Sequence, residues 1–499
     1  MKKTKIIASI GPASDSVETM TEMVNNGMDC ARINLSHATE ESILKTIEVI
    51  REVRKICNRP IAIMYDTKGP EFRTLEFESE GVTLEKGDTI RMSKTCIQGN
   101  EEEFGVNHSE AIDLIEVGNK VLIDNALLEL EVIEKQDDHV VLEALGDGDI
   151  KNHKTVNVPG VDLKLDFISE ADERDISFAA KHSCDYLALS FVTSKEDVIA
   201  AREIIEESGG DALIISKIES SKGIENIDEI IEVSDGIMVA RGDLGVEVSL
   251  EKLPMLQKGI IKKCREKGKF AIVATEMLAS MYESPRPTRA EVSDVANAIL
   301  DGTDCVMLSG ETTVGKHPVE SVEMMSRICK YVESTIDYTK HTAYKGTIEV
   351  SDTIAKLVIE AVEYLDIKLI VAPTMTGFTA RKISNFRPNP LILACCPSKH
   401  IAEKVVLNFG VKAVITDIFS NTSEMARNLK KIAKEEFNLN KGDLIVITGG
   451  FPLGESEKTN AIRIAEIDFW KWRFTLMKLS RKKTIKKFKS ILKKQIIKI

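Results

Sequence analysis

Short runs of apolar, β-branched residues recur along the chain, and stretches with helical spacing separate them. Such continuous apolar runs are typical of strands buried on both faces, as in a parallel sheet. Segments 198–207 and 253–267 carry the helical spacing. The runs begin at Lys5, Cys30, Ile61, Asp185, Ala212, Gly236, Phe270 and Cys305. Eight alternations of strand and helix favour a (β/α)8 TIM barrel, although two separate α/β units would show the same count.

Two intervals depart from this rhythm. Between residues 71 and 158 the pattern changes to short alternating strands with turn signals, which predicts an inserted small β-barrel domain. From about Thr347 a fresh α/β pattern begins, with apolar runs near residues 369, 391, 413 and 444. The predicted organisation is a catalytic barrel of residues 1–70 and 159–346, a β lid of 71–158, a C-terminal α/β effector domain of 347–467 and a basic tail of 468–499.

The tail has its own charge pattern. Residues 468–499 hold both tryptophans and carry a net charge of +11, so the remaining chain carries −23 within the total of −12. Ile485, Phe488, Leu492 and Ile496 fall on one face of a helix, as in a basic amphipathic segment that contacts an anionic surface. The alternative is an extension without a role.

Overall composition limits the class of protein. A net charge of −12 argues against a general nucleic-acid binder. Nine scattered cysteines without a CxxC pair fit a reducing compartment. The basic N-terminus leads into a strand-like run that ends at Gly11-Pro12, and no apolar stretch is long enough to span a bilayer. We therefore expect a cytoplasmic protein.

Polar and charged residues gather at the ends of the predicted barrel strands, where barrel enzymes place their functional side chains. Alternation directs Lys217 and Glu219 to the same side of their strand. Glu219 and Asp243, at neighbouring strand ends, could hold a hard divalent cation, since two carboxylates with substrate oxygens and water are a usual magnesium arrangement. Each residue alone could instead form a structural ion pair or a cap, but several buried together without function would be costly.

No GxxxxGK[ST] or GxGxxG fingerprint occurs, so a Walker-type nucleotide cradle is excluded. At these strand ends the chain closely resembles the pyruvate kinase family, from Lys3 to about Ile467. The segments that carry the resemblance are TKIIASIGPAS, ARINLSHAT, YDTKGPEFRT, ISKIES, DGIMVARGDLGVEV, ATEMLASM and SPRPTRAEVSDVANAILDGTDCVMLSGET. Their combined length and order make a chance match implausible.

The resemblance implies an activity and a set of catalytic roles. The activity is transfer of the phosphoryl group of phosphoenolpyruvate to ADP, giving pyruvate and ATP in glycolysis, with Mg²⁺ and K⁺ as cofactors. Glu219 and Asp243 match the magnesium ligands, and Lys217 matches the lysine that stabilises the transferred group and the developing enolate. Arg32 and Arg73 match arginines that contact phosphate. Residues that match the substrate-binding positions are Arg32, Gly242, Asp243 and Thr275, with Thr275 also expected near a proton relay.

The resemblance also assigns the other ligands. Residues that match the potassium site are Asn34, Ser36, Asp66 and Thr67. Residues that match nucleotide-contacting positions are Asn34, His37, Arg73 and Lys154. Glu71 fits the potassium-dependent form of the family. The β lid is expected to close over the barrel mouth, and the family is usually a homotetramer.

The C-terminal domain resembles the family less completely. TMTGFTAR is similar to the phosphate-gripping loop of the effector site, which would bind a sugar phosphate or a nucleotide, and hydroxyls with backbone N–H groups at a helix start form a phosphate seat. The candidate residues are Thr374, Thr376, Gly377 and Thr379. The alternative is a simple helix cap, because Glu455 and Glu457 in the distal loop are unfavourable for a phosphorylated sugar. Two departures lie in the barrel: Glu276 replaces a common glutamine, and Ala171 replaces a usual lysine.

Two other function classes remain open from the sequence. An aldolase or lyase of phosphoenolpyruvate or enolate chemistry would share the barrel but lack the inserted β domain and the potassium-site oxygens. A catalytically dead protein that binds nucleic acid or membrane through its tail would not need the complete set of Lys217, Glu219, Asp243 and Arg73.

Overall fold

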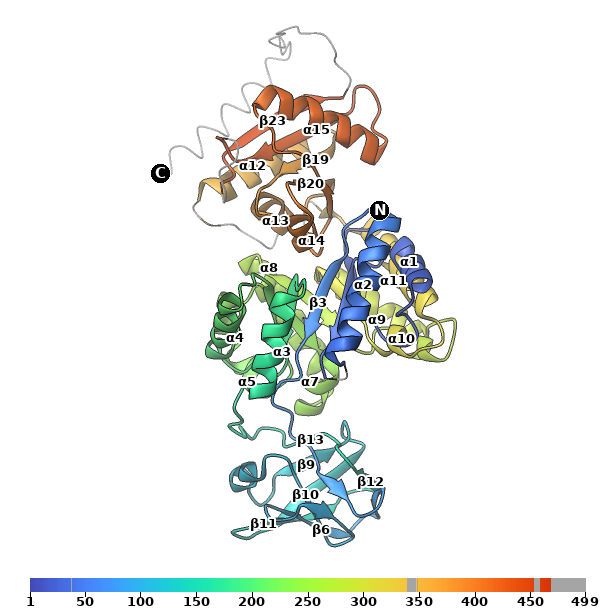
Figure 1. Cartoon of the computed structure of the whole chain (residues 1–499), viewed down its shortest axis with the longest axis vertical. Helices are drawn as coiled ribbons and strands as arrows, with labels where there is room; N and C mark the ends of the chain where they lie inside the picture. The colour runs from blue at the N-terminus through green and yellow to red at the C-terminus, as the bar shows by residue number, and fades with distance from the viewer. Residues whose placement is uncertain (37, 339–346, 348, 453–457, 468–499) are drawn as a thin grey trace.

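The structure, a computed structural model, describes residues 1–36, 38–338, 347, 349–452 and 458–467. A barrel forms the middle of the molecule, a β domain lies at one end and an α/β domain at the other (Figure 1). Among the described residues, no helix combines the length and the apolar character needed to cross a membrane. The basic tail of residues 468–499 lies outside the described residues.

Eight parallel strands form a closed barrel, which confirms the predicted TIM barrel over the alternative of two α/β units. Every residue of β1 (Lys5–Ser9), β3 (Ala62–Asp66), β16 (Gly236–Ala240) and β17 (Phe270–Ala274) is buried, as expected for strands covered on both faces. Around the ring the strands are β1 (Lys5–Ser9), β18 (Cys305–Leu308), β17 (Phe270–Ala274), β16 (Gly236–Ala240), β15 (Leu213–Ile218), β14 (Tyr186–Leu189), β3 (Ala62–Asp66) and β2 (Cys30–Asn34).

Helices surround this barrel and pack on its outer face. Four of them begin with a capping box, in which Thr39, Ser169, Ser194 or Thr288 exchanges hydrogen bonds with the third helical residue. The helices are α1 (Val17–Asn26), α2 (Glu40–Cys57), α3 (Glu170–Lys181), α4 (Lys195–Glu207), α5 (Ser221–Glu225), α6 (Ile227–Val233), α7 (Arg241–Glu247), α8 (Leu253–Lys267), η2 (Ala279–Tyr282), α9 (Arg289–Asp301), α10 (Gly310–Thr313) and α11 (Pro318–Thr335).

The segment after β3 folds as a separate β domain around its own hydrophobic core. Its strands form one six-stranded sheet and two two-stranded sheets. The predicted small β domain therefore consists of three sheets around one core. Its elements are β4 (Glu76–Phe77), β5 (Gly81–Leu84), β6 (Thr89–Ser93), β7 (Gln98–Gly99), β8 (Glu103–Gly105), η1 (Ser109–Leu114), β9 (Lys120–Ile123), β10 (Leu128–Lys135), β11 (His139–Ala144), β12 (Gly148–Lys151) and β13 (Val156–Asn157).

The C-terminal domain is a five-stranded sheet with helices on its faces. The four predicted strands are present, and the sequence reasoning missed a fifth, which pairs antiparallel at the edge of the sheet. The strands, in sheet order, are β21 (Val411–Ile415), β20 (Leu391–Cys396), β19 (Ile367–Pro373), β22 (Leu444–Gly449) and β23 (Ala461–Glu466). The helices are α12 (Val350–Tyr364), α13 (Phe378–Asn385), α14 (Lys399–Lys404) and α15 (Thr422–Phe437).

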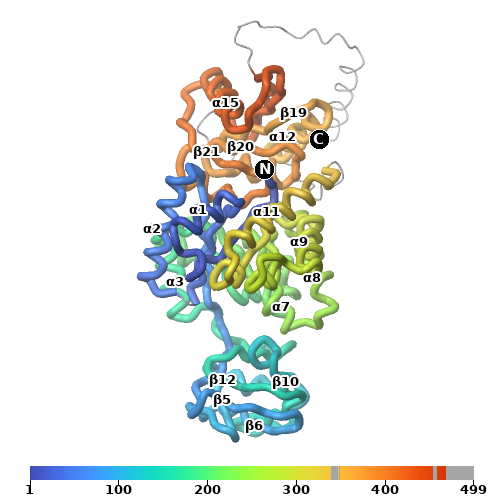
Figure 2. Tube along the Cα trace, turned by 90° about the vertical axis from the view of Figure 1, so that its right-hand side faces the viewer, coloured from blue at the N-terminus to red at the C-terminus, as the bar shows by residue number. Residues whose placement is uncertain are grey.

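The C-terminal domain closes the amino-terminal end of the barrel, opposite the β domain (Figures 1 and 2). Val406 and Leu407, which follow α14, are buried in one cluster with the inward-facing side chains of the barrel strands. Arg387 forms an ion pair with Asp304 at 2.8 Å across the same junction. The C-terminal domain thus supplies the floor of the barrel core.

Candidate active site

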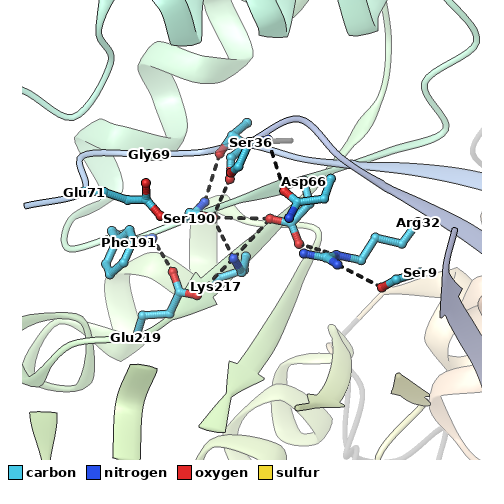
Figure 3. Close-up of polar contacts among 12 residues, drawn as sticks. Ser9, Arg32, Ser36, Asp66, Gly69, Glu71, Ser190, Phe191, Lys217 and Glu219 are labelled. Atoms are coloured by element: carbon cyan, nitrogen blue, oxygen red, sulfur yellow. Dashed lines mark hydrogen bonds and ion pairs between the residues drawn. The ribbon is translucent and has the colours of Figure 1, made fainter. Parts of the chain in front are cut away.

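The predicted site lies at the carboxyl ends of neighbouring barrel strands, and Lys217 of β15 is its centre (Figure 3). Its Nζ lies 3.0 Å from Oε1 of Glu219 and 3.1 Å from Oδ1 of Asp66. It also donates a hydrogen bond of 2.6 Å to Oγ of Ser190. Only 12% of the Lys217 side chain is exposed, and both carboxylates are 1% exposed. The structure therefore brings together Lys217, Glu219 and Asp66 as one buried ionic cluster.

The charge on Lys217 is stabilised by this cluster. Burial alone would lower the pKa of Lys217, but the charges of Asp66 and Glu219 outweigh burial and hold the pKa above its ordinary value. The ammonium group is thus positive at neutral pH, where it can stabilise negative charge on a ligand.

Asp66, the last residue of β3, lies between two cations. Arg32 of β2 places its Nε 2.6 Å from Oδ2 of Asp66 and donates from Nη1 to Oγ of Ser9 at 2.8 Å. Burial would raise the pKa of Asp66, yet Arg32 and Lys217 outweigh it and hold that pKa below its ordinary value. Asp66 therefore stays ionised and orients both positive side chains.

Glu219 and Asp243 are the candidate ligands for a divalent cation. Glu219 accepts a hydrogen bond of 2.7 Å from the backbone N–H of Phe191, and Asp243 lies in the first turn of α7. Burial raises the pKa of Glu219 to about 7; Lys217 lowers it, and the like charge of Asp243 raises it further. This carboxylate is therefore under-neutralised by its protein surroundings, which fits a bound cation.

Among the described residues no cluster of three or more His, Cys, Asp or Glu could hold a metal on its own. The chain would supply two carboxylates, and substrate oxygens and water would complete the shell. That division of ligands is the one magnesium favours when it bridges a protein to a phosphorylated substrate.

The oxygen-bearing residues predicted for potassium lie side by side. Asn34 and Asp66 are partners in the register of β2 and β3. The Asn34 side chain accepts a hydrogen bond of 3.2 Å from the backbone N–H of Ser36. The carbonyl of Thr67 accepts a 2.7 Å hydrogen bond from Oγ of Ser190. The four residues thus lie at the carboxyl ends of the adjacent strands β2 and β3, and they carry the carbonyl, amide, hydroxyl and carboxylate oxygens that suit a monovalent cation.

Arg73 and Lys154 lie at the stem of the β domain, outside the Lys217 cluster. Arg73 binds both carboxylate oxygens of Glu71 at 2.8 Å and donates to the carbonyl of His153 at 2.6 Å. Lys154 pairs with Asp124 at 2.8 Å. The hydrogen bond to Glu71, more than the nearby negative charges, raises the pKa of Arg73 above its ordinary value.

The strand end after β17 carries the predicted Thr275. The backbone N–H of Gly242 donates to its Oγ1 at 2.8 Å, so these two predicted substrate-binding residues are in direct contact. Glu276, the departure from the family pattern, is exposed. His37 lies outside the described residues.

The effector candidates surround a pocket of the C-terminal domain. Thr374, Thr376 and Thr379 line it, and Gly377 caps α13 with a positive φ of 85°. Thr379 shares a 2.9 Å hydrogen bond with Thr459. A side chain at Gly377 would collide with Val405, which explains why glycine stands there. Glu455 and Glu457 of the distal loop lie outside the described residues.

Two polar residues of the site were not assigned a role from the sequence. Ser190 follows β14 and touches Lys217, Asp66 and Thr67 at once. Arg241, the first residue of α7, donates hydrogen bonds to the strand end that carries Thr275. Both occupy the position just after a barrel strand, and that position was the available signal.

Comparisons with known proteins agree with this geometry. The family model described as "Pyruvate kinase, barrel domain" matches residues 1–322, and "Pyruvate kinase, alpha/beta domain" matches residues 352–465. A Staphylococcus epidermidis protein named pyruvate kinase is 43% identical over 469 residues, which are 93% of this chain and 80% of that relative. A Staphylococcus aureus protein of the same name is 42% identical over 469 residues, again 93% of this chain and 80% of that relative. The crystal structure of a pyruvate kinase from Cryptosporidium parvum is 39% identical with a TM-score of 0.89, and the match covers 94% of this chain and 96% of that one.

Proposed function

The chain belongs to the pyruvate kinase family, and on this premise we propose that it transfers the phosphoryl group of phosphoenolpyruvate to ADP, giving pyruvate and ATP in glycolysis. The observation that carries the proposal is the buried cluster of Lys217, Asp66 and Glu219 at the barrel mouth. Phosphoryl transfer asks a protein mainly to position the reactants and to neutralise the charge that spreads over the phosphoryl oxygens. A lysine held positive and oriented by two buried carboxylates suits that task.

The basic residues divide the work. Lys217 stabilises the negative charge of the phosphoryl group during its transfer and then that of the enolate that remains. Its ammonium group can do so because three partners hold it in place. Arg32, held by Asp66, binds phosphate oxygens from the barrel side. Arg73 does so from the stem of the β domain, where it must exchange part of its contact with Glu71 for the ligand.

Glu219 and Asp243 would hold Mg²⁺, which supplies positive charge at the substrate's phosphate and carboxylate when bound. Asn34, Ser36, Asp66 and Thr67 would hold K⁺. Gly242 and Thr275, which are hydrogen-bonded to each other, would lie beside the substrate carboxylate, and Thr275 would also lie near the enolate carbon that is protonated. That protonation gives pyruvate and makes the overall step strongly favourable.

Residues 71–158 would act as a lid. Closure over the barrel mouth excludes water that would hydrolyse the phosphoryl group, and it brings Lys154 toward ADP together with Asn34, His37 and Arg73. In the structure Lys154 is paired with Asp124, so nucleotide binding has to replace that ion pair. A complex with both substrates bound and the β domain unmoved would contradict this role.

Further features follow the family. We propose a cytoplasmic homotetramer in which the pocket around Thr374, Thr376, Gly377 and Thr379 takes a sugar phosphate or nucleotide effector. The basic tail could contact an anionic surface, and no nucleic-acid partner is expected. An aldolase or lyase is disfavoured because the matching family models cover the barrel and the α/β domain as those of pyruvate kinase.

The test is pyruvate formation from phosphoenolpyruvate and ADP, coupled to lactate dehydrogenase, with Mg²⁺ and K⁺ each present or omitted. Turnover that requires both ions supports the reaction and both cation assignments. Turnover without K⁺ keeps the reaction and refutes the potassium dependence inferred from Glu71. No turnover by folded protein in any mixture refutes the proposed activity.

A further inference from the structure

Thr275 has an unfavourable backbone conformation. It follows β17 with a φ of +67°, and Glu276 after it has a φ of +54°. Positive φ values are uncommon outside glycine and are genuine outliers for β-branched residues such as threonine. Such strain persists only when the surroundings hold it in place, and it is concentrated at functional sites.

Arg241 provides much of that restraint. Its Nη2 donates to the carbonyl oxygen of Thr275 at 2.5 Å. Its Nε lies 3.2 Å from the same oxygen and 3.2 Å from the carbonyl oxygen of Ala274. One planar guanidinium thus donates hydrogen bonds to the carbonyl groups of two consecutive residues, Ala274 and Thr275, at the end of the strand.

The threonine hydroxyl is fixed by the same turn. It donates to the carbonyl oxygen of Ala274 at 2.7 Å and accepts from the backbone N–H of Gly242 at 2.8 Å. Gly242 is the residue after Arg241, so a shift of Arg241 would move both the backbone of Thr275 and the partner of its hydroxyl.

Arg241 is itself anchored from behind. Its Nη1 pairs with Oδ2 of Asp294 on α9 at 2.5 Å, and its Nη2 lies 2.9 Å from the sulfur of Met277. Only 10% of its side chain is exposed. Each of the three side-chain nitrogens of Arg241 thus has a partner within the protein.

We propose that Arg241, anchored by Asp294, is a positioning residue that holds Thr275 in the conformation needed for its part in catalysis. The proposal rests on the proposed function, in which Thr275 faces the substrate and the enolate carbon. Without the guanidinium the turn relaxes toward an ordinary φ, and the hydroxyl leaves its place. Lysine cannot substitute, because a single ammonium group cannot bind both carbonyls and Asp294 with the same planar geometry.

The test compares R241K, R241Q and D294N with the unchanged protein. Two readouts are needed: pyruvate formation from phosphoenolpyruvate and ADP, and exchange of the methyl protons of pyruvate with D₂O, followed by NMR in the presence of ATP, Mg²⁺ and K⁺. The exchange reports the protonation chemistry near Thr275 without net phosphoryl transfer from phosphoenolpyruvate. We expect R241K and R241Q to lose about 10- to 100-fold in both rates, since small misplacements of a reacting group have effects of that size. D294N should lose less, in the same direction.

R202K is the matched control. Arg202 of α4 also binds a backbone carbonyl, that of Val233, and an aspartate, Asp235, with 3.0 and 3.1 Å contacts. It lies near the amino ends of the strands, and its replacement should leave both rates unchanged. If R241K fails to fold, D294N is the variant that tests the proposal, because it keeps the arginine and removes only the negative charge of its anchor.

A double-mutant cycle separates positioning from other roles. In a T275A background R241K should cause little further loss of exchange, because there is no hydroxyl left to position. Additive losses, or a raised KM for phosphoenolpyruvate with unchanged kcat, would overturn the proposal and indicate that Arg241 acts on the substrate directly. Unchanged rates in R241K would overturn it as well. Failure of the unchanged protein to form pyruvate would instead refute the proposed function.

Discussion

Lys217 and Asp66 are 151 residues apart in the chain, and the Nζ of one lies 3.1 Å from Oδ1 of the other. The barrel makes this contact, because β14 alone separates their strands, β15 and β3, in the ring. The ion pair joins the candidate phosphoryl-transfer lysine to the candidate potassium site. The two halves of the site are therefore coupled through one carboxylate.

Replacing Lys217 by methionine should lower kcat about 10²- to 10³-fold, because it removes a preorganised positive charge from the transition state. The substitution also leaves the buried carboxylates of Asp66 and Glu219 without the positive charge of Lys217, so a bound metal ion becomes more important for neutralising them. The coupled pyruvate assay measures the loss, and circular dichroism checks the fold. The control K222M changes an exposed lysine of α5 and should retain full activity. Equal activity of K217M and K222M would remove Lys217 from the mechanism.

Ser190→Ala should reduce kcat about tenfold with little change in KM. The hydroxyl accepts from Lys217 at 2.6 Å and donates to the carbonyl of Thr67 at 2.7 Å, and a hydrogen bond to a charged group is worth about 1.5–3 kcal/mol. S334A, at an exposed position near the end of α11, is the control. A variant with unaltered kcat would show that Asp66 and Glu219 orient Lys217 without the serine.

Glu219→Gln and Asp243→Asn should each raise the Mg²⁺ concentration needed for half-maximal rate by at least about tenfold, since loss of a direct ligand costs no less than loss of an outer partner. Titration with Mg²⁺ at fixed substrate measures the effect. E225Q, an exposed carboxylate nearby in the sequence, should leave the titration unchanged. Unchanged Mg²⁺ curves for both site variants would refute the proposed ligands.

Glu71→Lys should make the enzyme less dependent on K⁺. The substitution places a fixed positive charge beside Arg73, where Glu71 now binds that arginine through both oxygens. Turnover measured against KCl at constant ionic strength should show a higher rate without K⁺ than the unchanged protein has. E80K, an exposed change in the same segment, serves as the control. The inference fails if E71K and the unchanged protein require K⁺ equally.

The buried Lys5 should make the free energy of unfolding depend on pH. This buried lysine donates to the carbonyl of Val411 at 2.5 Å, and burial, only partly opposed by Asp29, lowers its pKa to about 8. Between pH 8 and about 10.4 the unfolded chain keeps the proton that the folded chain has lost, so the free energy of unfolding rises with pH, by up to about 3 kcal/mol. Below pH 8 both states are protonated and the contribution is flat.

Lys5→Met should remove the contribution of Lys5 to the rise in unfolding free energy with pH. Burial also lowers the pKa of Lys3 to about 8, and the contribution of Lys3 should remain in this variant. Denaturation by urea from pH 7.5 to 10 measures the difference between the two proteins. K55M, at an exposed position of α2, should follow the unchanged protein. Parallel curves for K5M and K55M would show that Lys5 is charged in the folded state.

The sequence predicts much of the barrel and its site because the apolar runs that form the barrel strands carry the site residues at their carboxyl ends. Continuous apolar stretches identified all eight strands, and period-two alternation placed Lys217 and Glu219 on one side. The edge strand β23 was missed because AIRIAE is short and mixes apolar with charged residues, as a half-exposed strand does.

Other features depend on the folded backbone. The positive φ of Thr275 is set by the turn after β17, and no residue type in ATEM signals it. The pairing of Arg73 with Glu71 likewise depends on how the chain leaves the barrel. Ser190 could have been found, since it directly follows the barrel strand β14, but a lone serine carries little chemical signal.

Because Val406 and Leu407 of the C-terminal domain are buried in the barrel core, the barrel and the C-terminal domain are not independent modules. A fragment ending after α11 would expose the interior ends of its strands to water and would be prone to aggregate. Exchange of C-terminal domains between relatives is therefore constrained by steric fit at these two positions, independently of any ligand. Recombination that preserves both residues retains a sealed core, whereas recombination that introduces smaller side chains leaves a cavity under the catalytic strands.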